Sequence, residues 1–473
     1  MKNYFLFFIL SFVSLFSCQQ SEQAKSDEAN AKTDAATKPV YNMLDAPEWA
    51  KNASIYEVNL RQYTEEGTIQ AFMPHIPRLK DMGVDILWFM PMHPISETKR
   101  KGELGSPYAV SDYRAINPEF GSMEDFVKMK NEIHRAGMYL IIDWVPNHTG
   151  WDHKWIKEHP DYYTKNDAGE IIDPIDYNTG ESWGWTDVAD LNYDNPKMRE
   201  AMINDMKYWI ADVGIDGFRV DVAHGVPTDF WDKCVVDLMK VKKCFLLAEA
   251  EVPHLRNVSG FHMDYGWDFH HLMNDIVKGK HNANDIQKWY GENRAKYSGG
   301  YHMHFTSNHD ENTWSGTEFD RMGDGHKAFA VLACTFDGMP LVYSGQEEPL
   351  RKRLEFFKKD NIGFKDYEYT DFYRSLLTLK KKNKALWNGK FGGEPQRIST
   401  NADEQVYAYK REKDGDKVLV ILNLSKKPVD VTLNSAGFEG DYMDLFANST
   451  LMVGKEMNMK LKAWDYLVLT NKF

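Results

Sequence analysis

The sequence contains few cysteines and no excess of basic residues. Of the four cysteines among 473 residues, one lies within the first 18 residues, and the odd number that remains does not make a disulfide framework. Cys234, Cys244 and Cys334 lie in apolar contexts, so we expect buried thiols, with a Cys234–Cys244 bridge left open. The chain has 57 Lys and Arg against 70 Asp and Glu, a formal net charge of -13. We therefore expect no nucleic-acid partner, because phosphate binding requires a basic face.

Long hydrophobic runs are also missing beyond the first residues. In residues 1–17, Lys2 precedes an apolar stretch that is too short to cross a bilayer and predicts a signal peptide. The stretch ends at Ser17-Cys18, and a small residue directly before Cys resembles a bacterial lipoprotein cleavage box. That resemblance implies lipidation of Cys18, whereas an ordinary secretory signal is the alternative. Residues 18–47 are polar and aperiodic, which predicts a flexible tether.

These features together predict where the protein acts. A signal peptide, a lipidated Cys18 and a tether are typical of a secreted protein anchored in a membrane by its acyl chains. We expect it on the cell envelope of a Gram-negative bacterium, at the outer membrane or the periplasmic face, and we expect a monomer.

The remaining composition is globular and rich in aromatic residues. Hydrophobic residues make up 42% of the chain, enough to build a large core and to exclude wholesale disorder. The chain also has 14 Trp and 24 Tyr. Aromatic rings with polar tips form flat platforms that suit the apolar face and hydroxyl rim of a sugar.

From Trp49 onward, short β-branched or aromatic runs alternate with helical patterns. This alternation indicates βα units and a parallel sheet. Eight such runs predict an α/β fold, a (β/α)8 TIM barrel, over residues 48–388. Residues 149–190 are too long for a simple loop and predict a small excursion inserted after the third strand. The candidate strands are Ser54–Leu60, Ile86–Pro91, Tyr139–Val145, Gly217–Val222, Phe245–Ala250, a weak one near Phe261–Asp264, Tyr301–Ser307 and Pro340–Ser344.

Helix signals and a change of pattern complete the expected organisation. Ser122 and Asp125 form a capping-box pattern, and Asn195-Pro196 opens a second helix whose methionine stripe we expect in the core. After Trp387 the chain alternates as strands do, with Asp414-Gly415 as a hairpin turn. Residues 389–473 therefore predict a C-terminal antiparallel β-sandwich domain.

Polar residues follow four of the predicted strands at their carboxyl ends, where barrel enzymes place their active sites. A lone carboxylate there is usually a cap or an ion-pair partner, but like charges brought together cost free energy and indicate chemistry. Two carboxylates flanking a bond are the minimal machinery for glycoside hydrolysis. Arg219 precedes Asp221 by two residues, so we expect it to face the same side and keep Asp221 ionised.

These segments resemble the signature regions of the α-amylase family, glycoside hydrolase family 13. The resemblance covers about Trp49–Phe473, and the four motifs appear in the family's order. They are Asp143-x-x-x-Asn147-His148, Gly217-x-Arg219-x-Asp221, Glu249 in its apolar run, and Asn308-His309-Asp310.

The resemblance implies roles for individual residues. Asp221 would be the nucleophile, Glu249 the general acid/base and Asp310 the stabiliser of the transition state. Tyr108 would stack under the cleaved sugar, and the remaining substrate-binding residues would be His148, Arg219, His309 and His224.

The resemblance leaves a calcium site open. Family calcium sites often use the Asn of the Asn-His pair and an Asp at the end of the excursion, here Asn147 and Asp190. Calcium prefers several oxygen ligands, and two do not make a site. No organic cofactor is implied.

The activity implied by the resemblance is a retaining hydrolase of α-1,4-glucosidic bonds in starch, glycogen or maltodextrins. An α-glucan transglycosylase is one alternative, and a neopullulanase-like or oligosaccharide-cleaving enzyme is another, favoured by Ala189-Asp190-Leu191-Asn192. A non-catalytic surface glycan-binding protein is less consistent with Asp221, Glu249 and Asp310 all being present.

Overall fold

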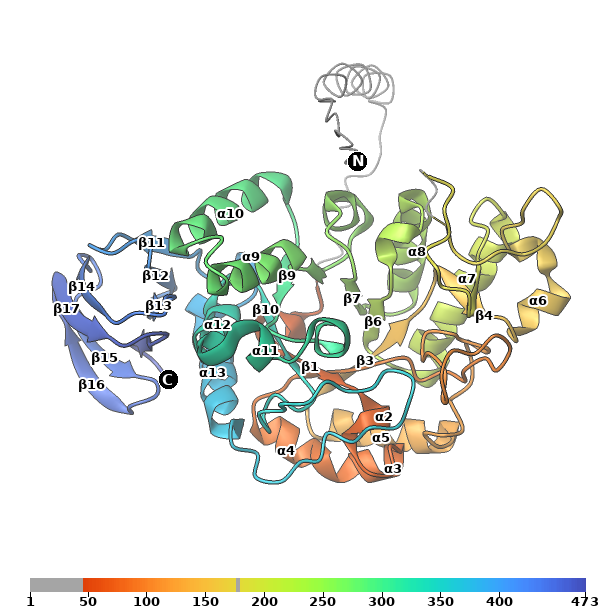
Figure 1. Ribbon diagram of the computed structural model, residues 1–473, viewed down its shortest axis with the longest axis horizontal. Coiled ribbons are helices and arrows are strands. Elements are labelled where there is room, and N and C mark those ends of the chain that lie inside the picture. Colours follow the sequence, from red (N-terminus) through yellow and green to blue (C-terminus); the bar gives the residue numbers. More distant parts are fainter. Residues whose placement is uncertain (1–45, 176–178) are drawn as a thin grey trace, which may run out of the picture. The chain divides into compact units, whose positions relative to one another are not determined.

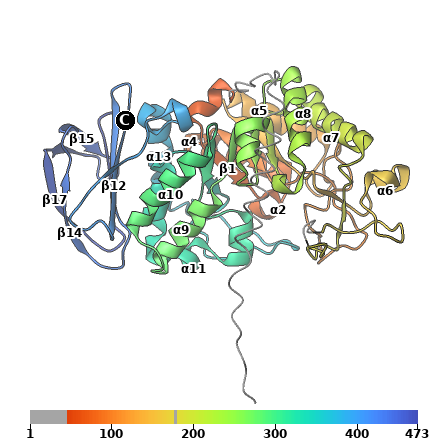
Figure 2. The same ribbon diagram turned by 90° about the horizontal axis from the view of Figure 1, so that it is seen from above.

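The computed structural model describes residues 46–175 and 179–473. The predicted signal peptide, the lipidation site Cys18 and the tether up to residue 45 lie outside the described residues. Eight parallel strands form a closed barrel in the order β1-β10-β9-β8-β7-β6-β3-β2 (Figures 1 and 2). This confirms the predicted barrel, including the weak sixth strand. The strands are β1 (Ile55–Val58), β2 (Ile86–Phe89), β3 (Tyr139–Trp144), β6 (Gly217–Val220), β7 (Phe245–Ala248), β8 (Met263–Tyr265), β9 (Tyr301–His304) and β10 (Met339–Tyr343).

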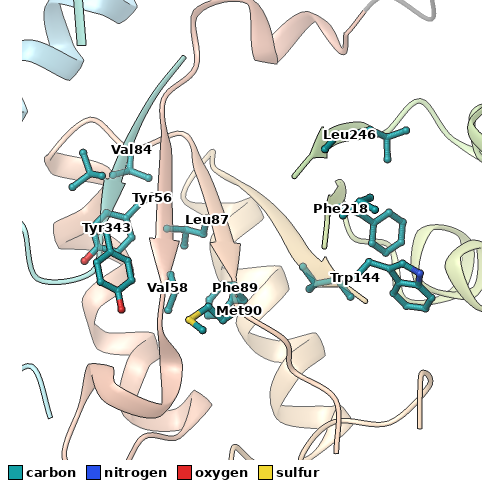
Figure 3. Close-up of a cluster of buried hydrophobic side chains, with 14 of the residues drawn as sticks. Tyr56, Val58, Val84, Leu87, Phe89, Met90, Trp144, Phe218, Leu246 and Tyr343 are labelled. Atoms are coloured by element: carbon teal, nitrogen blue, oxygen red, sulfur yellow. The ribbon is translucent and has the colours of Figure 1, made fainter. Parts of the chain in front are cut away.

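Side chains along each barrel strand alternate between two hydrophobic clusters, as the pleat requires. Ile55 and Trp88 belong to the cluster that fills the barrel. Tyr56 and Leu87 belong to the larger cluster between the strands and the surrounding helices, part of which Figure 3 shows. Interior positions near the carboxyl ends of the strands are therefore the ones that can present polar side chains to a site.

The helices surround the barrel, and both predicted start signals are confirmed. The Ser122 hydroxyl accepts the Asp125 N–H at 3.1 Å, and the Asn195 side chain accepts the Lys197 N–H at 2.9 Å. The methionine stripe of the second helix is buried, as expected. The helices are α2 (Leu60–Tyr63), α3 (Ile69–Phe72), α4 (Ile76–Asp81), α5 (Met123–Arg135), α6 (Lys154–Glu158), α7 (Pro196–Tyr208), α8 (Thr228–Val241), α9 (Trp267–Val277), α10 (Ala283–Lys296), α11 (Glu318–Met322), α12 (His326–Thr335) and α13 (Thr370–Lys382).

The segment between β3 and α7 forms the inserted excursion. Its two ends pair with each other, because β4 (His148–Gly150) runs antiparallel to β5 (Val188–Asp190), and α6 lies between them. The pairing fixes His148 and Asp190 as direct neighbours across this small sheet.

A C-terminal antiparallel domain follows the barrel, as predicted. Asp414 and Gly415 both have positive φ values, 51° and 84°, which is the geometry of the expected tight hairpin. The six-stranded sheet has the order β11-β12-β13-β18-β15-β16, and β14 pairs with β17. The strands are β11 (Gln396–Ile398), β12 (Val406–Lys413), β13 (Asp416–Asn423), β14 (Val429–Asn434), β15 (Gly440–Asp444), β16 (Ser449–Val453), β17 (Glu456–Leu461) and β18 (Tyr466–Thr470).

Two further expectations concern thiols and membrane spans. Cys234, Cys244 and Cys334 are buried and free, so the Cys234–Cys244 bridge does not form. Within the ranges that the structure describes, every helix is too short or too polar to span a bilayer.

Candidate active site

Arg219 on β6 is the centre of the polar cluster inside the mouth of the barrel. Its side chain is fully buried, and Nη1 donates to Asp143 Oδ1 at 2.9 Å and to Asp221 Oδ1 at 2.8 Å. Nη2 lies 2.8 Å from Glu249 Oε1. Because the two nitrogens belong to one planar guanidinium, Asp221 and Glu249 are held close together.

The same contacts determine the charges of the carboxyl groups. Burial and the negative charge of Glu249 raise the pKa of Asp221 well above its usual value, although Arg219 opposes them. Burial also raises the pKa of Asp143, to about 6. Arg219 thus favours the charged form of Asp221, as expected, but three carboxylates share its one guanidinium, so the ionisation of Asp221 stays a prediction.

Glu249 differs from Asp221 in the direction of its pKa. Burial again disfavours the charged form, but Arg219 and a hydrogen bond from the Val222 N–H, at 2.8 Å to Oε2, lower the pKa. Val222 has a left-handed backbone with φ of 43°, which is uncommon and strained for a β-branched residue. The strained turn after Asp221 thus points a backbone donor at Glu249.

His309 connects the third carboxylate to the barrel interior. Its Nδ1 lies 2.5 Å from Glu57 Oε1, and its Nε2 lies 3.4 Å from Asp310 Oδ2. Burial opposes a charge on the ring, but Asp310 and Glu57 outweigh it and raise the pKa of His309 to about 9. His309 is therefore a cation at neutral pH and donates from both nitrogens. The Asp310 side chain is 35% exposed, so it faces the opening.

Tyr108 joins the two halves of the site. Its hydroxyl donates to Asp143 Oδ2 at 3.2 Å and lies 2.7 Å from His309 Nε2. Its ring is nearly parallel to that of His309, with the centroids 5.6 Å apart. The predicted stacking residue thus lies within the same hydrogen-bonded network as Arg219 and His309.

The two other predicted histidines differ in burial and in partners. His148 is buried at the start of β4, its ring edge-on to Trp185 at 5.7 Å, and burial lowers its pKa to about 4. His224 is exposed in the turn after Asp221, with Nδ1 3.3 Å from the Glu249 carbonyl. His148 is therefore neutral, and His224 lies beside the Glu249 segment.

Sequence reasoning missed three side chains that complete the site. Glu57 is fully buried on β1 and contacts His309, as described above. Trp88 on β2 donates from Nε1 to Asp143 at 3.2 Å, and the Tyr265 hydroxyl on β8 accepts from Arg219 at 3.1 Å. A signal for Glu57 exists in the sequence, since it is a carboxylate at an interior position of an otherwise apolar strand.

Asn147 and Asp190 are the two residues expected to bind calcium. They belong to adjacent segments, because the Leu191 N–H donates to the Asn147 carbonyl at 3.3 Å. Across residues 46–175 and 179–473, no three His, Cys, Asp or Glu side chains gather as metal ligands. The pair supplies one carboxylate and one amide oxygen, and calcium also takes backbone carbonyl oxygens, so the calcium site stays a prediction.

Comparisons with known proteins agree with this geometry. Residues 24–361 match the model of the alpha amylase catalytic domain, and residues 397–468 match that of the maltogenic amylase C-terminal domain. Alpha-amylase 3 of Dictyoglomus thermophilum is 26% identical over 80% of this chain and 86% of its own length. The maltogenic alpha-amylase of Bacillus acidopullulyticus is 23% identical over 91% and 80%.

A solved structure of similar fold supports the same family. The crystal structure of a maltogenic alpha-amylase from Thermotoga neapolitana superposes with a TM-score of 0.80 at 28% identity, covering 90% of this chain and all of that one. The family model spans most of the chain, and the barrel carries the family's motifs on the expected strands. The protein therefore belongs to the α-amylase family of glycoside hydrolases.

Proposed function

We propose that the protein hydrolyses α-1,4-glucosidic bonds with retention of anomeric configuration. The observation that carries the proposal is the arrangement around Arg219, whose two terminal nitrogens each lie 2.8 Å from a carboxylate, one of Asp221 and one of Glu249. Retaining glycosidases use two carboxyl groups about 5–5.5 Å apart. A shared guanidinium is consistent with a separation of that order.

The proposed reaction is a double displacement. Asp221 attacks the anomeric carbon and forms a glycosyl ester while Glu249 gives its proton to the departing oxygen. Glu249 then deprotonates a water, which attacks the same carbon and releases Asp221. Asp310 stabilises the positive charge that develops on the sugar in both steps, and Tyr108 stacks under the ring.

The proton must reside on Glu249 when the reaction begins. The carboxyl groups around Arg219 are coupled and titrate as a set, so a neighbouring charge moves the proton between them. When Asp221 is ionised, as its attack requires, its negative charge disfavours a second charge beside it and leaves the shared proton on Glu249.

For the substrate, we propose starch, glycogen or maltodextrins, with short or cyclic maltooligosaccharides as the second candidate. The match to a maltogenic amylase C-terminal domain supports the second candidate, as does a 24% identical relative named cyclomaltodextrinase from Thermoanaerobacter pseudethanolicus. The test is a product profile on starch, pullulan, maltodextrins and cyclodextrins.

Retention of configuration has its own test. It predicts that NMR detects the α-anomer as the first product, and an initial β-anomer would contradict it.

Product analysis also distinguishes hydrolysis from glycosyl transfer and from binding alone. With maltoheptaose, products longer than the substrate indicate a transglycosylase, whereas only shorter products indicate a hydrolase. Binding of starch without any release of reducing sugar would indicate a glycan-binding protein. Repeating the assay with a chelator tests the calcium prediction. If activity is lost and added Ca²⁺ restores it, the enzyme requires the metal.

We also propose that the protein is lipid-anchored through Cys18. The support is the signal-like sequence of residues 1–17 alone. Metabolic labelling with a fatty acid and membrane fractionation of the wild type and Cys18→Ser test it. Equal labelling of both would contradict the proposal.

A further inference from the structure

Trp314 is exposed to solvent in a protein that buries most of its aromatic side chains. In the described ranges, the two tryptophans among the exposed large hydrophobic residues are Trp314, with 55% of its surface exposed, and Trp185, with 36%. Burying an indole is favourable, so a fixed and exposed one indicates a surface that a ligand covers. Trp314 lies four residues after Asp310, in the segment between β9 and α11.

The backbone on both sides of Trp314 is held by the long loop between β10 and α13. Arg353 Nη2 donates to the Trp314 carbonyl at 3.1 Å. The Thr313 hydroxyl donates to the Leu354 carbonyl at 3.1 Å, and the Leu354 N–H donates to Asn312 Oδ1 at 2.9 Å. The exposed indole is therefore attached to an ordered turn, which reduces the entropy lost when a ligand stacks on it.

Aromatic rings connect Trp314 to the catalytic centre. The Phe356 ring lies 5.4 Å from that of Trp314, and it is parallel to that of Tyr108, with the centroids 6.2 Å apart. A small pocket borders the same ring, and Asn59, Arg61 and Gln62 contribute polar groups to its lining. The surface next to Tyr108 thus continues outward as an aromatic face beside a polar recess.

The position of this aromatic face relative to the catalytic carboxylates indicates which side of the cleaved bond it would contact. Glu249, which would protonate the departing oxygen, lies on β7 with His224 beside it. By the proposed function, Tyr108 and His309 would contact the unit that stays on the enzyme, and Trp314 is connected to Tyr108 through Phe356. On the basis of the proposed function, we infer that Trp314 and Phe356 form a stacking platform for a glucosyl unit on the non-reducing side of the cleaved bond.

The test compares wild type, Trp314→Ala and Trp314→Tyr on two substrates. Maltoheptaose reaches the platform, whereas 4-nitrophenyl α-glucoside has no sugar beyond the unit that is attacked. We expect Trp314→Ala to lower kcat/KM for maltoheptaose about 2- to 12-fold, mainly through KM, and to leave the glucoside unchanged. Trp314→Tyr should recover much of the loss. Met452→Ala serves as the control, since Met452 is 70% exposed on β16 and distant in the fold.

The outcomes separate this inference from the proposed function. If the wild type cleaves maltoheptaose and Trp314→Ala cleaves it equally well, the platform is wrong. An equal loss on both substrates would also overturn it, because Trp314 would then act on the structure of the site. If the wild type cleaves no glucan, the proposed function fails. Calorimetric titration with maltoheptaose still decides the platform in that case, since Trp314→Ala must weaken binding and Met452→Ala must not.

Discussion

Arg219 determines the electrostatics of the site because it is the cation that several buried carboxylates share. It contacts Asp143, Asp221 and Glu249, each within 2.9 Å. Removing one partner of a buried ion pair leaves an uncompensated charge, so each member of the cluster is structurally as well as chemically important. Replacements that keep the shape of a carboxyl group are therefore the informative ones.

Glu249→Gln keeps the shape of the side chain but removes the proton that the proposed mechanism needs. General acid–base catalysis contributes about 10²–10⁴-fold, so we expect kcat on maltodextrins to fall by at least that range, with glucan binding retained. The matched control is Glu97→Gln, because the Glu97 side chain is 86% exposed in the loop after β2. Wild-type turnover in Glu249→Gln would reject the assignment.

The charge on His309 predicts a pH-dependent contribution to stability. Its pKa rises from 6.5 to about 9 in the folded protein, because Asp310 and Glu57 outweigh the effect of burial. The contribution is therefore complete below about pH 6.5 and is lost as the pH rises toward 9. His309→Gln should lower the free energy of unfolding by about 3 kcal/mol more at pH 6 than at pH 10. Denaturant titrations of both proteins measure this, and a pH-independent difference would contradict the assigned charge.

At the scale of elements, the first residue of β6 shows why the motif there begins with glycine. A Cβ built on Gly217 would lie 1.9 Å from the Phe245 carbonyl oxygen, and its φ is +156°. The backbones of β6 and β7 approach so closely only without a side chain. This approach positions Arg219 and Asp221 next to Glu249.

Gly217→Ala should therefore destabilise the protein by about 3 kcal/mol or more, because the clash is with backbone that cannot move freely. The control is Gly137→Ala, where φ is +71° and the nearest atom is Lys80 Nζ at 3.8 Å. Gly137→Ala should lower the free energy of unfolding by only about 1–2 kcal/mol, because alanine is disfavoured in a left-handed backbone. Thermal unfolding compares them, and equal losses would show that the approach of the strands is unimportant.

The sequence predicted the elements whose hydrophobic pattern is strong and missed those whose pattern is weak. All eight barrel strands were predicted because β-branched or aromatic runs alternate with helical patterns along the chain, and β8, the weakest run, was recognised from its place in that series. In the C-terminal domain, β11, β15, β16 and β17 were not predicted. Most residues of β15 and β16 are exposed or half-buried and show no clean alternation. The network around His309 was also missed in part, because Glu57 is 252 residues away and carries no local motif.

At the scale of the whole molecule, the barrel and the C-terminal sheet share buried hydrogen bonds. Arg411 on β12 is 1% exposed and donates to carbonyls near the end of α12, to Thr335 at 3.0 Å and to Phe336 at 2.6 Å. Its other donors bond to the Gly393 and Trp387 carbonyls. The Arg411 side chain thus connects the barrel with the C-terminal sheet, so we expect the barrel and the sheet to unfold together.

Arg411→Leu tests this connection. The replacement leaves four carbonyl acceptors without their donor, and we expect a loss of about 3 kcal/mol or more because unsatisfied buried polar groups are costly. Lys410→Leu is the control, since adjacent strand residues face opposite sides. Calorimetry should show one transition for the wild type and a lower melting temperature for Arg411→Leu. An unchanged melting temperature would contradict the coupling.

The central claim is that Asp221 attacks the sugar while Glu249 and Asp310 act at the same carbon. The most direct measurement is mass spectrometry of the enzyme after reaction with 5-fluoro-α-glucosyl fluoride, whose glycosyl ester hydrolyses slowly. The account predicts one fluoroglucosyl unit on the peptide that contains Asp221, and none on Asp221→Asn. A label on another residue, or hydrolysis that proceeds with inversion and without any labelled enzyme, would contradict it.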